Sequence, residues 1–180
     1  MTRITAVTDA QANAAQQALF AAVKAQLGMT PNLMRTVGHS PAALEGYLSL
    51  NGALGKGILP VALRERIALT VAQLNGCDYC LSAHTYIGSN IAKLSAEEIK
   101  AARMAESSDA KTTAALRFAR AVVEQRGRVS DSAVQDVRNA GYSEAEVVEM
   151  VLNVSLNILT NYINNVAHTS IDFPVVTANS

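Results

Sequence analysis

Cys77, Cys80 and His84 lie close together, directly after the helix-breaking residue Gly76. On a helix that starts near Cys77, residues three and four apart are neighbours, so all three side chains would face one side. The free N–H groups and the dipole of a helix N-terminus favour a thiolate. A histidine one turn away can take up or return a proton near neutral pH. The segment therefore predicts a nucleophilic thiol, a second thiol that resolves it and an acid–base group, as in a peroxidase or a disulfide reductase.

Two other uses of these residues compete with redox chemistry. Buried cysteines often serve as small hydrophobic side chains. Cys77, Cys80, His84 and an acidic residue such as Glu65 are also residue types that ligate zinc. Structural zinc sites usually take a second pair of ligands from a separate segment, however, and the chain has only these two cysteines. We therefore favour a site without a metal or another cofactor.

A structural disulfide between Cys77 and Cys80 is not expected. Such a bond stabilises a protein mainly by closing a long loop, and residues three apart close almost none. In a reducing compartment, a cysteine pair of this kind is more often catalytic or metal-binding. The residues leave open which thiol attacks, because the helix N-terminus favours Cys77 and proximity to His84 favours Cys80.

Glu65 lies on the preceding predicted helix, between Arg64 and Arg66. It is either a solvated charge paired with the neighbouring arginines or a buried carboxylate that relays protons and orients His84. Among the remaining candidates, His39 is expected in a loop or cap and His168 at the end of an apolar helix. Tyr162 lines a pocket or packs a helix.

The elements that position these residues are predicted to be helices. Hydrophobic residues make up 49% of the chain and aromatic residues 4%, so the core must come mainly from Ala, Leu, Val and Ile. Alanine and leucine are strong helix formers. Start and stop signals include Ser40-Pro41 and the capping boxes at Ser95 and Ser143. They predict helices over residues 9–27, from 31, from 41, 60–74, from 77, from 95, 109–125, 130 or 131 to 141, and 144–168.

No segment alternates apolar and polar residues as a strand would. Residues 171–176 contain Pro174 and are expected to form an extended clip. We find no linker-like stretch rich in Gly, Ser or Pro. The sequence therefore predicts one all-α domain over residues 1–180 with roughly seven to nine helices.

Charge and hydropathy exclude several partners. Fifteen basic and fifteen acidic residues give a net charge of zero, and no Lys/Arg run suggests nucleic acid. The N-terminal residues lack the apolar stretch of a signal peptide. No segment reaches the ~18–20 uninterrupted apolar residues of a membrane span. We expect a cytoplasmic protein that binds neither nucleic acid nor membrane.

An internal echo connects two parts of the chain. Ala83-His84-Thr85 recurs as residues 167–169, and at the same offset Glu65 falls on Glu149. Cys77 and Cys80 fall on asparagines. An old helical duplication with one inactive copy would explain the echo, and chance similarity between two helices of similar composition is the alternative.

The motif resembles a known family. Residues 65–67, 75–80 and His84 are similar to the signature of the AhpD-like alkylhydroperoxidases of the carboxymuconolactone decarboxylase superfamily. Residues 160–165 followed by 172–174 are similar to its peroxidase-related branch. The resemblance implies an all-α fold that assembles as trimers or hexamers. It also implies reduction of organic hydroperoxides or hydrogen peroxide, with an unidentified thiol reductant as a second partner.

The resemblance also implies roles for the site residues. Cys80 would be the thiol that attacks the peroxide, Cys77 would resolve it as a disulfide, and His84 and Glu65 would form a proton relay. In the best-known branch a histidine precedes the second cysteine, where this chain has Tyr79. Because tyrosine is a poor base near pH 7, this difference lowers the expected peroxidase efficiency.

Three other functions compete with the peroxidase. One is a thiol–disulfide carrier or redox sensor, and another is a structural oligomer with a vestigial site. The third is a decarboxylase-like enzyme that acts on a lactone. Cys77 and Cys80 argue against this last function, since the decarboxylase branch lacks the paired cysteines.

Overall fold

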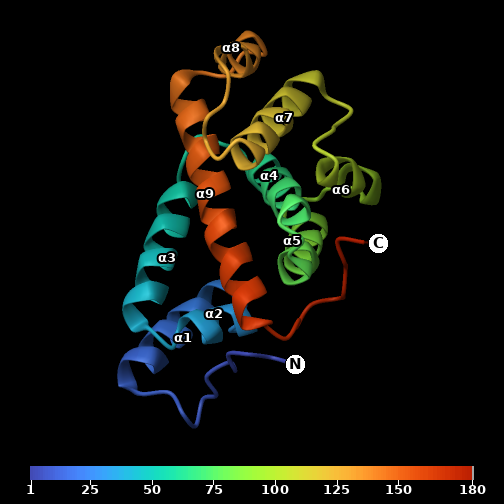
Figure 1. Ribbon diagram of the computed structural model, residues 1–180. Coiled ribbons are helices and arrows are strands. Elements are labelled where there is room, and N and C mark those ends of the chain that lie inside the picture. The colour runs from blue at the N-terminus through green and yellow to red at the C-terminus, as the bar shows by residue number, and fades with distance from the viewer. Residues whose placement is uncertain (180) are drawn as a thin grey trace.

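The computed structural model describes residues 1–179, and all regular secondary structure in this range is helical, as predicted. Figure 1 shows the order of the helices along the chain. No helix of the described part is long and apolar enough to cross a membrane. The helices are α1 (Ala14–Leu27), α2 (Asn32–Val37), α3 (Pro41–Gly55), α4 (Val61–Leu74), α5 (Asp78–Asn90), α6 (Ala96–Arg103), α7 (Ala110–Glu124), α8 (Asp131–Asn139) and α9 (Glu144–Ala167).

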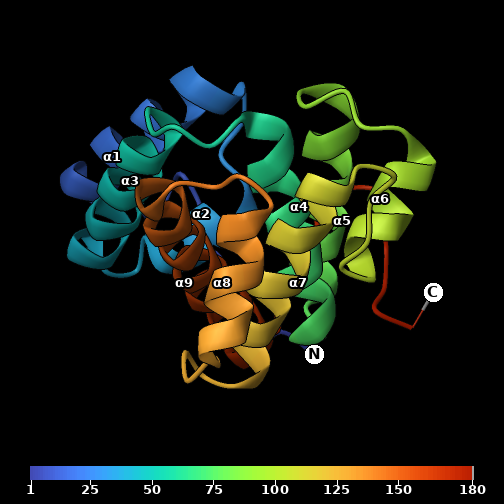
Figure 2. The ribbon, with the colours of Figure 1, turned by 90° about the horizontal axis from the view of Figure 1, so that it is seen from above.

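Helix α4 lies at the centre of the fold. It packs against α5, α6, α7 and α9. Seen from above, α1–α3 lie on one side and α5 and α6 on the other, with α4, α7 and α9 between them (Figure 2). All residues from Ile67 to Ala72 are buried, and a helix that is apolar on every side belongs in a core. Glu65 therefore lies on a rigid, fully surrounded element.

Local capping explains where most helices begin. The side chain of Ser40 caps α3 ahead of Pro41, and reciprocal capping boxes at Ser95 and Ser143 start α6 and α9. Each cap satisfies backbone N–H groups that the first turn of a helix leaves unpaired. These starts are the ones that the sequence predicts.

Two predicted helix ends were wrong. Helix α1 begins at Ala14 instead of residue 9, because Asn13 forms a capping box with Gln16. The residues before it form a separate turn, in which the backbone N–H and the hydroxyl of Thr8 both donate to the side-chain oxygen of Gln11. Helix α8 ends at Asn139, ahead of Gly141, which has the left-handed φ of +91°. In both cases the predicted range is too long, because it includes the turn that flanks the helix.

The break between α4 and α5 positions the motif. Gly76 has a φ of +59°, a region that residues with a Cβ rarely adopt. The chain reverses there, and α4 and α5 pack side by side. Cys77 follows as the N-cap of α5, which places it one residue outside the helix. The motif helix is thereby directed back along α4.

The tail forms the clip expected from its proline. The N–H of Val176 donates to Ser82 Oγ at 2.9 Å, and the N–H of Ala178 donates to Asp78 Oδ1 at 2.8 Å. Gln73 Nε2 donates to the carbonyl oxygen of Ala178 at 2.9 Å. The tail thus fastens to the first turn of α5 and the last turn of α4 (Figure 1).

The two segments of the internal echo have different structures. Residues 65–84 contain the break between α4 and α5, whereas residues 149–167 belong to the single helix α9. Glu149 does not contact a histidine as Glu65 does. It accepts hydrogen bonds from the N–H groups of Ile58 and Leu59, and a Cβ on Gly57 would lie 2.4 Å from its carboxylate. The second copy is a structural element that holds the loop before α4.

Candidate active site

The two cysteines lie at the start of α5. Cys77 is the N-cap, and its Sγ accepts a hydrogen bond from the N–H of Cys80 at 3.4 Å. Both side chains are buried and both are free thiols. Among residues 1–179, no cluster of three or more His, Cys, Asp or Glu side chains is arranged to hold a metal ion.

Glu65 of α4 and His84 of α5 form a direct pair. His84 Nδ1 lies 2.8 Å from Glu65 Oε2, and the side chains are 22% and 14% exposed, respectively. Of the two alternatives for Glu65, the contact with His84 is the one present. A carboxylate on Nδ1 fixes the tautomer of the imidazole and leaves Nε2 for another partner. His84 is one turn beyond Cys80 on the same helix face.

A cavity of about 80 Å³ brings three of the four predicted residues together. Cys80, His84 and Glu65 line it, whereas Cys77 does not. The other lining residues come from α2, α3, α4, α5 and α9: Leu33, Tyr47, Asn51, Arg64, Ala68, Tyr79, Ala83, Asn153, Leu156, Asn157 and Thr160. The Cys80 thiol, the His84–Glu65 pair and a small cavity thus meet on one side of α5.

Helix α9 supplies site residues that the sequence analysis missed. Asn164 Nδ2 donates to Cys80 Sγ at 3.2 Å, and Asn161 lies fully buried nearby. Asn153 and Asn157 line the cavity. These asparagines recur at helical spacing within an otherwise apolar tract. That spacing is the sequence signal that could have marked them as site residues. Their contact with a motif 84 residues away was not visible in the sequence.

The two thiols have opposite acidities. The hydrogen bond with Cys77 lowers the pKa of Cys80, and the charge of His84 and the amides of Asn164 and Asn161 also lower it, against the effect of burial. The hydrogen bond with Cys80, burial and the charge of Cys80 raise the pKa of Cys77. Of the two thiols, Cys80 is therefore the more acidic one.

The acidity of His84 is set by two opposing effects. Burial favours the neutral imidazole, but the charge and hydrogen bond of Glu65 outweigh it and raise the pKa of His84. The negative charge of Cys80 acts in the same direction. His84 therefore keeps its proton to a higher pH than a free histidine does, and it can deliver that proton to a leaving group.

Tyr79 occupies the position between the cysteines where a relay histidine was considered. Its hydroxyl donates to Asp172 Oδ1 at 2.8 Å and accepts from the N–H of Leu33 at 3.0 Å. Its ring meets Phe173 edge to face. A tyrosine hydroxyl has a single proton, and here it is donated in the hydrogen bond to Asp172, so Tyr79 holds the tail rather than offering a proton to the cavity.

The other sequence candidates lie outside this cavity. His39 Nε2 lies 2.8 Å from the carbonyl oxygen of Thr5 in the N-terminal segment. His168 is the exposed C-cap of α9 in the left-handed conformation. Tyr162 is 57% exposed on α9, so it neither lines the cavity nor packs in the core.

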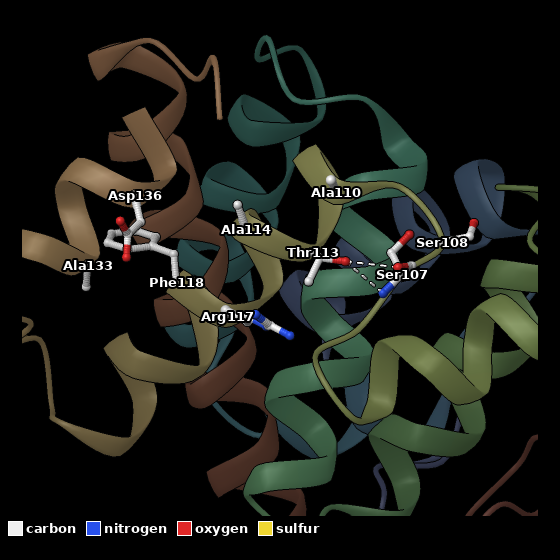
Figure 3. Close-up of a pocket in the computed structure, with 9 residues that line it drawn as sticks. All are labelled: Ser107, Ser108, Ala110, Thr113, Ala114, Arg117, Phe118, Ala133 and Asp136. Atoms are coloured by element: carbon white, nitrogen blue, oxygen red, sulfur yellow. Dashed lines mark hydrogen bonds between the residues drawn. The ribbon is translucent and has the colours of Figure 1, made fainter. Parts of the chain in front are cut away.

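A larger hollow of about 550 Å³ lies elsewhere, over α7, α8 and the loop before α7 (Figure 3). Ser107 and Thr113 hydrogen-bond to each other at its edge, and Arg117 pairs with Glu106. None of the predicted site residues lines this hollow. Size alone therefore does not identify the active site in this fold.

Comparison with known proteins agrees with the fold and the motif. The model of the carboxymuconolactone decarboxylase family matches residues 41–125, which include Glu65, Cys77, Cys80 and His84. No curated protein matches the sequence significantly.

Several solved structures share the fold at low sequence identity. One is an AhpD-core, peroxidase-related protein from Ralstonia eutropha JMP134, 21% identical with a TM-score of 0.83 over 95% of this chain and 92% of that chain. Another is the debrominase Bmp8, 22% identical with a TM-score of 0.80 over 96% and 93%. A putative antioxidant defence protein AhpD from Agrobacterium tumefaciens is 22% identical, with a TM-score of 0.68 over 77% and 94%. Over residues 41–125 the chain is thus similar to the carboxymuconolactone decarboxylase family, and it shares the fold of AhpD-like proteins.

Proposed function

We propose that this protein is a thiol peroxidase that reduces organic hydroperoxides or hydrogen peroxide through a disulfide cycle of Cys80 and Cys77. The observation that carries the proposal is the joint exposure of the Cys80 sulfur and the His84–Glu65 pair to one small cavity. A peroxidase needs a thiolate and a proton donor on the same substrate, and both are within reach there. The cavity is small and lined by both polar and apolar side chains, which suits a small peroxide.

The environment of the two cysteines supports Cys80 as the attacking thiol. Cys80 faces the cavity and has the lowered pKa, whereas Cys77 lies behind it and keeps its proton. The helix N-terminus does act on Cys77, whose Sγ accepts the N–H of Cys80, but the hydrogen bond with the Cys80 thiol and burial outweigh it and raise the pKa of Cys77. The Cys77 side chain is hydrogen-bonded to that of Cys80, so Cys77 is the thiol placed to resolve the oxidised sulfur.

The proposed cycle balances in three steps. The Cys80 thiolate attacks the outer peroxide oxygen, the O–O bond breaks, and the leaving alkoxide or hydroxide takes the proton of His84. Cys80 is then a sulfenic acid, which Cys77 attacks to form a disulfide and release water. A thiol reductant donates two electrons and two protons to the disulfide and restores both thiols. This dependence on a reductant fits a cytoplasmic enzyme.

Thiol counting tests the proposal most directly. We expect the reduced protein to have two reactive thiols and to lose both after one equivalent of hydrogen peroxide, and likewise after one equivalent of tert-butyl hydroperoxide with one equivalent of alcohol formed. Dithiothreitol should restore both thiols and sustain continued peroxide consumption. Two thiols that survive excess peroxide would overturn the proposal.

The same measurements separate the alternative functions. A thiol–disulfide carrier would exchange with dithiols without consuming peroxide at a useful rate, and a lactone decarboxylase would not need its thiols. The similarity in fold to a debrominase suggests a further arm with 2,3,4-tribromopyrrole, which is bound in a structure of that protein. Debromination without peroxide turnover would assign the thiol pair to reductive dehalogenation.

We also propose that each chain forms one domain and that the chains assemble as a homo-oligomer through α9. Large hydrophobic side chains are exposed along its outer face, and no Asp, Glu, Lys or Arg occurs in residues 150–167. The positions 148, 152, 155, 159, 162 and 166 alternate in steps of four and three, which is the spacing of a helix-pairing seam. Packing against a second copy of the chain would cover this face of α9.

Light scattering at micromolar concentration should give an oligomeric mass, with trimers or hexamers expected from the family resemblance. Leu159→Glu puts a charge in the middle of the seam and should lower the mass toward that of one chain, because an unpaired charge is costly in an apolar interface. Leu27→Glu on α1 is the matched control, since Leu27 is exposed but lies off α9. A monomeric parent protein would refute the assembly.

A further inference from the structure

The buried face of α9 is unusually rich in asparagine. Asn153, Asn157, Asn161 and Asn164 are 4%, 7%, 0% and 3% exposed. Steps of four, four and three place them on one side of the helix. A buried amide is unfavourable unless its polar atoms are hydrogen-bonded, so four of them on one face require an explanation.

The side-chain N–H groups of Asn153 and Asn157 are hydrogen-bonded within α9 itself. Asn153 Nδ2 donates to the carbonyl oxygen of Glu149, and Asn157 Nδ2 donates to that of Asn153, both at 2.8 Å. Each bond closes onto the preceding turn of the same helix. These two amides therefore have partners that do not depend on the state of the cysteines.

The other two asparagines, Asn161 and Asn164, are directed at the cysteine motif. Asn164 Nδ2 donates to Cys80 Sγ at 3.2 Å. Asn161 is held by Asn75, whose Nδ2 donates to Asn161 Oδ1 at 2.9 Å, and this leaves Asn161 Nδ2 buried without a partner. Asn161 also acts on Cys80 and helps to lower the pKa of that thiol.

Sulfur accepts hydrogen bonds weakly as a thiol and strongly as a thiolate. One amide N–H already on the sulfur, and a second that is buried, unpaired and next to it, suit the charged state better than the neutral state. Asn75 at the end of α4 holds Asn161 in this orientation. The arrangement links the sulfur to α4, α5 and α9 at once.

We propose that Asn164 and Asn161 form an amide cradle that stabilises the Cys80 thiolate. Asn164 is the direct donor to the sulfur, and Asn161 is a second donor positioned by Asn75. This role deepens the proposed function but concerns only the acidity of a thiol, so it can be tested without any peroxide.

The test measures the rate at which iodoacetamide alkylates Cys80 as a function of pH, with the modified site located by peptide mass spectrometry. Asn164→Leu keeps a similar side-chain volume and removes the donor. We expect the pKa of Cys80 to rise, and the alkylation rate at pH values well below that pKa to fall about tenfold for each unit of the rise. Asn161→Leu should change both quantities in the same direction by less.

Asn139→Leu is the matched control, because Asn139 is exposed at the end of α8 and its side chain accepts only from Gln135 among the hydrogen bonds described, far from the cradle. The pKa of Cys80 in this control variant should equal the pKa of Cys80 in the parent protein. If Asn164→Leu does not fold, Asn164→Asp preserves the shape and should raise the pKa further through its charge. A parental pKa in a folded Asn164 variant would overturn the cradle. If the Asn164 variant has a raised pKa of Cys80 but the parent protein never reduces peroxide, the cradle is supported and the proposed function is refuted.

Discussion

Cys80→Ser is expected to abolish peroxide consumption and the trapping of a sulfenic acid, whereas Cys77→Ser is expected to form one sulfenic acid and then stop. Only Cys80 faces the cavity, so its loss removes the nucleophile. Cys77 lies behind it and is the only other cysteine of the chain, so its loss removes the resolving thiol. Stopped-flow peroxide reduction with a sulfenic-acid probe and intact-protein mass spectrometry measures both effects.

The two variants serve as controls for each other. Both replace one buried sulfur with an oxygen, so a general loss of stability would affect them similarly, and thermal melting checks this. Trapped sulfenic acid in Cys80→Ser but not in Cys77→Ser would reverse the assignment of the two roles. Parental peroxide turnover in both variants would exclude the thiol mechanism altogether.

Removal of the acid–base pair should have the next largest effect. His84→Asn is expected to slow peroxide reduction by about 10²–10⁴-fold, the usual effect of losing a general acid or base. Glu65→Gln should slow it less, because the imidazole remains but loses the carboxylate at Nδ1. Glu45→Gln is a matched control, since Glu45 is exposed on α3 and does not line the cavity.

The pH profile separates these roles. In the parent, the rate should fall at low pH as the Cys80 thiolate is protonated and at high pH as His84 loses its proton. Glu65 raises the pKa of His84, so Glu65→Gln should move the alkaline limb to lower pH. In the same variant His84 carries less positive charge. Because that charge lowers the pKa of Cys80, the acid limb should move to higher pH. A slower Glu65→Gln enzyme with an unchanged profile would mean that Glu65 only supports the fold.

Local interactions made much of the fold predictable. Ser40, Ser95 and Ser143 cap helices through backbone groups only three residues away, so a short stretch of sequence contains the whole interaction. The spacing of Cys80 and His84 likewise implies a shared helix face. The all-α class and most helix starts follow from signals of this kind.

The contents of the cavity depended on the tertiary structure. Glu65 was open to two interpretations until α4 and α5 packed side by side and brought it to His84. Tyr79 could be assigned to the tail only once Asp172 was seen beside it.

The sequence by itself determined the helical class, the thiol pair and its histidine, because each rests on residues a few positions apart. Only the tertiary structure decided which thiol is the acidic one. That choice rests first on the hydrogen bond between the two thiols, and Asn164 adds to it from a helix 84 residues further along the chain. Periodicity shows that Asn164 lies on the same face of α9 as Asn161, but the packing of α9 against α5 determines what that face meets.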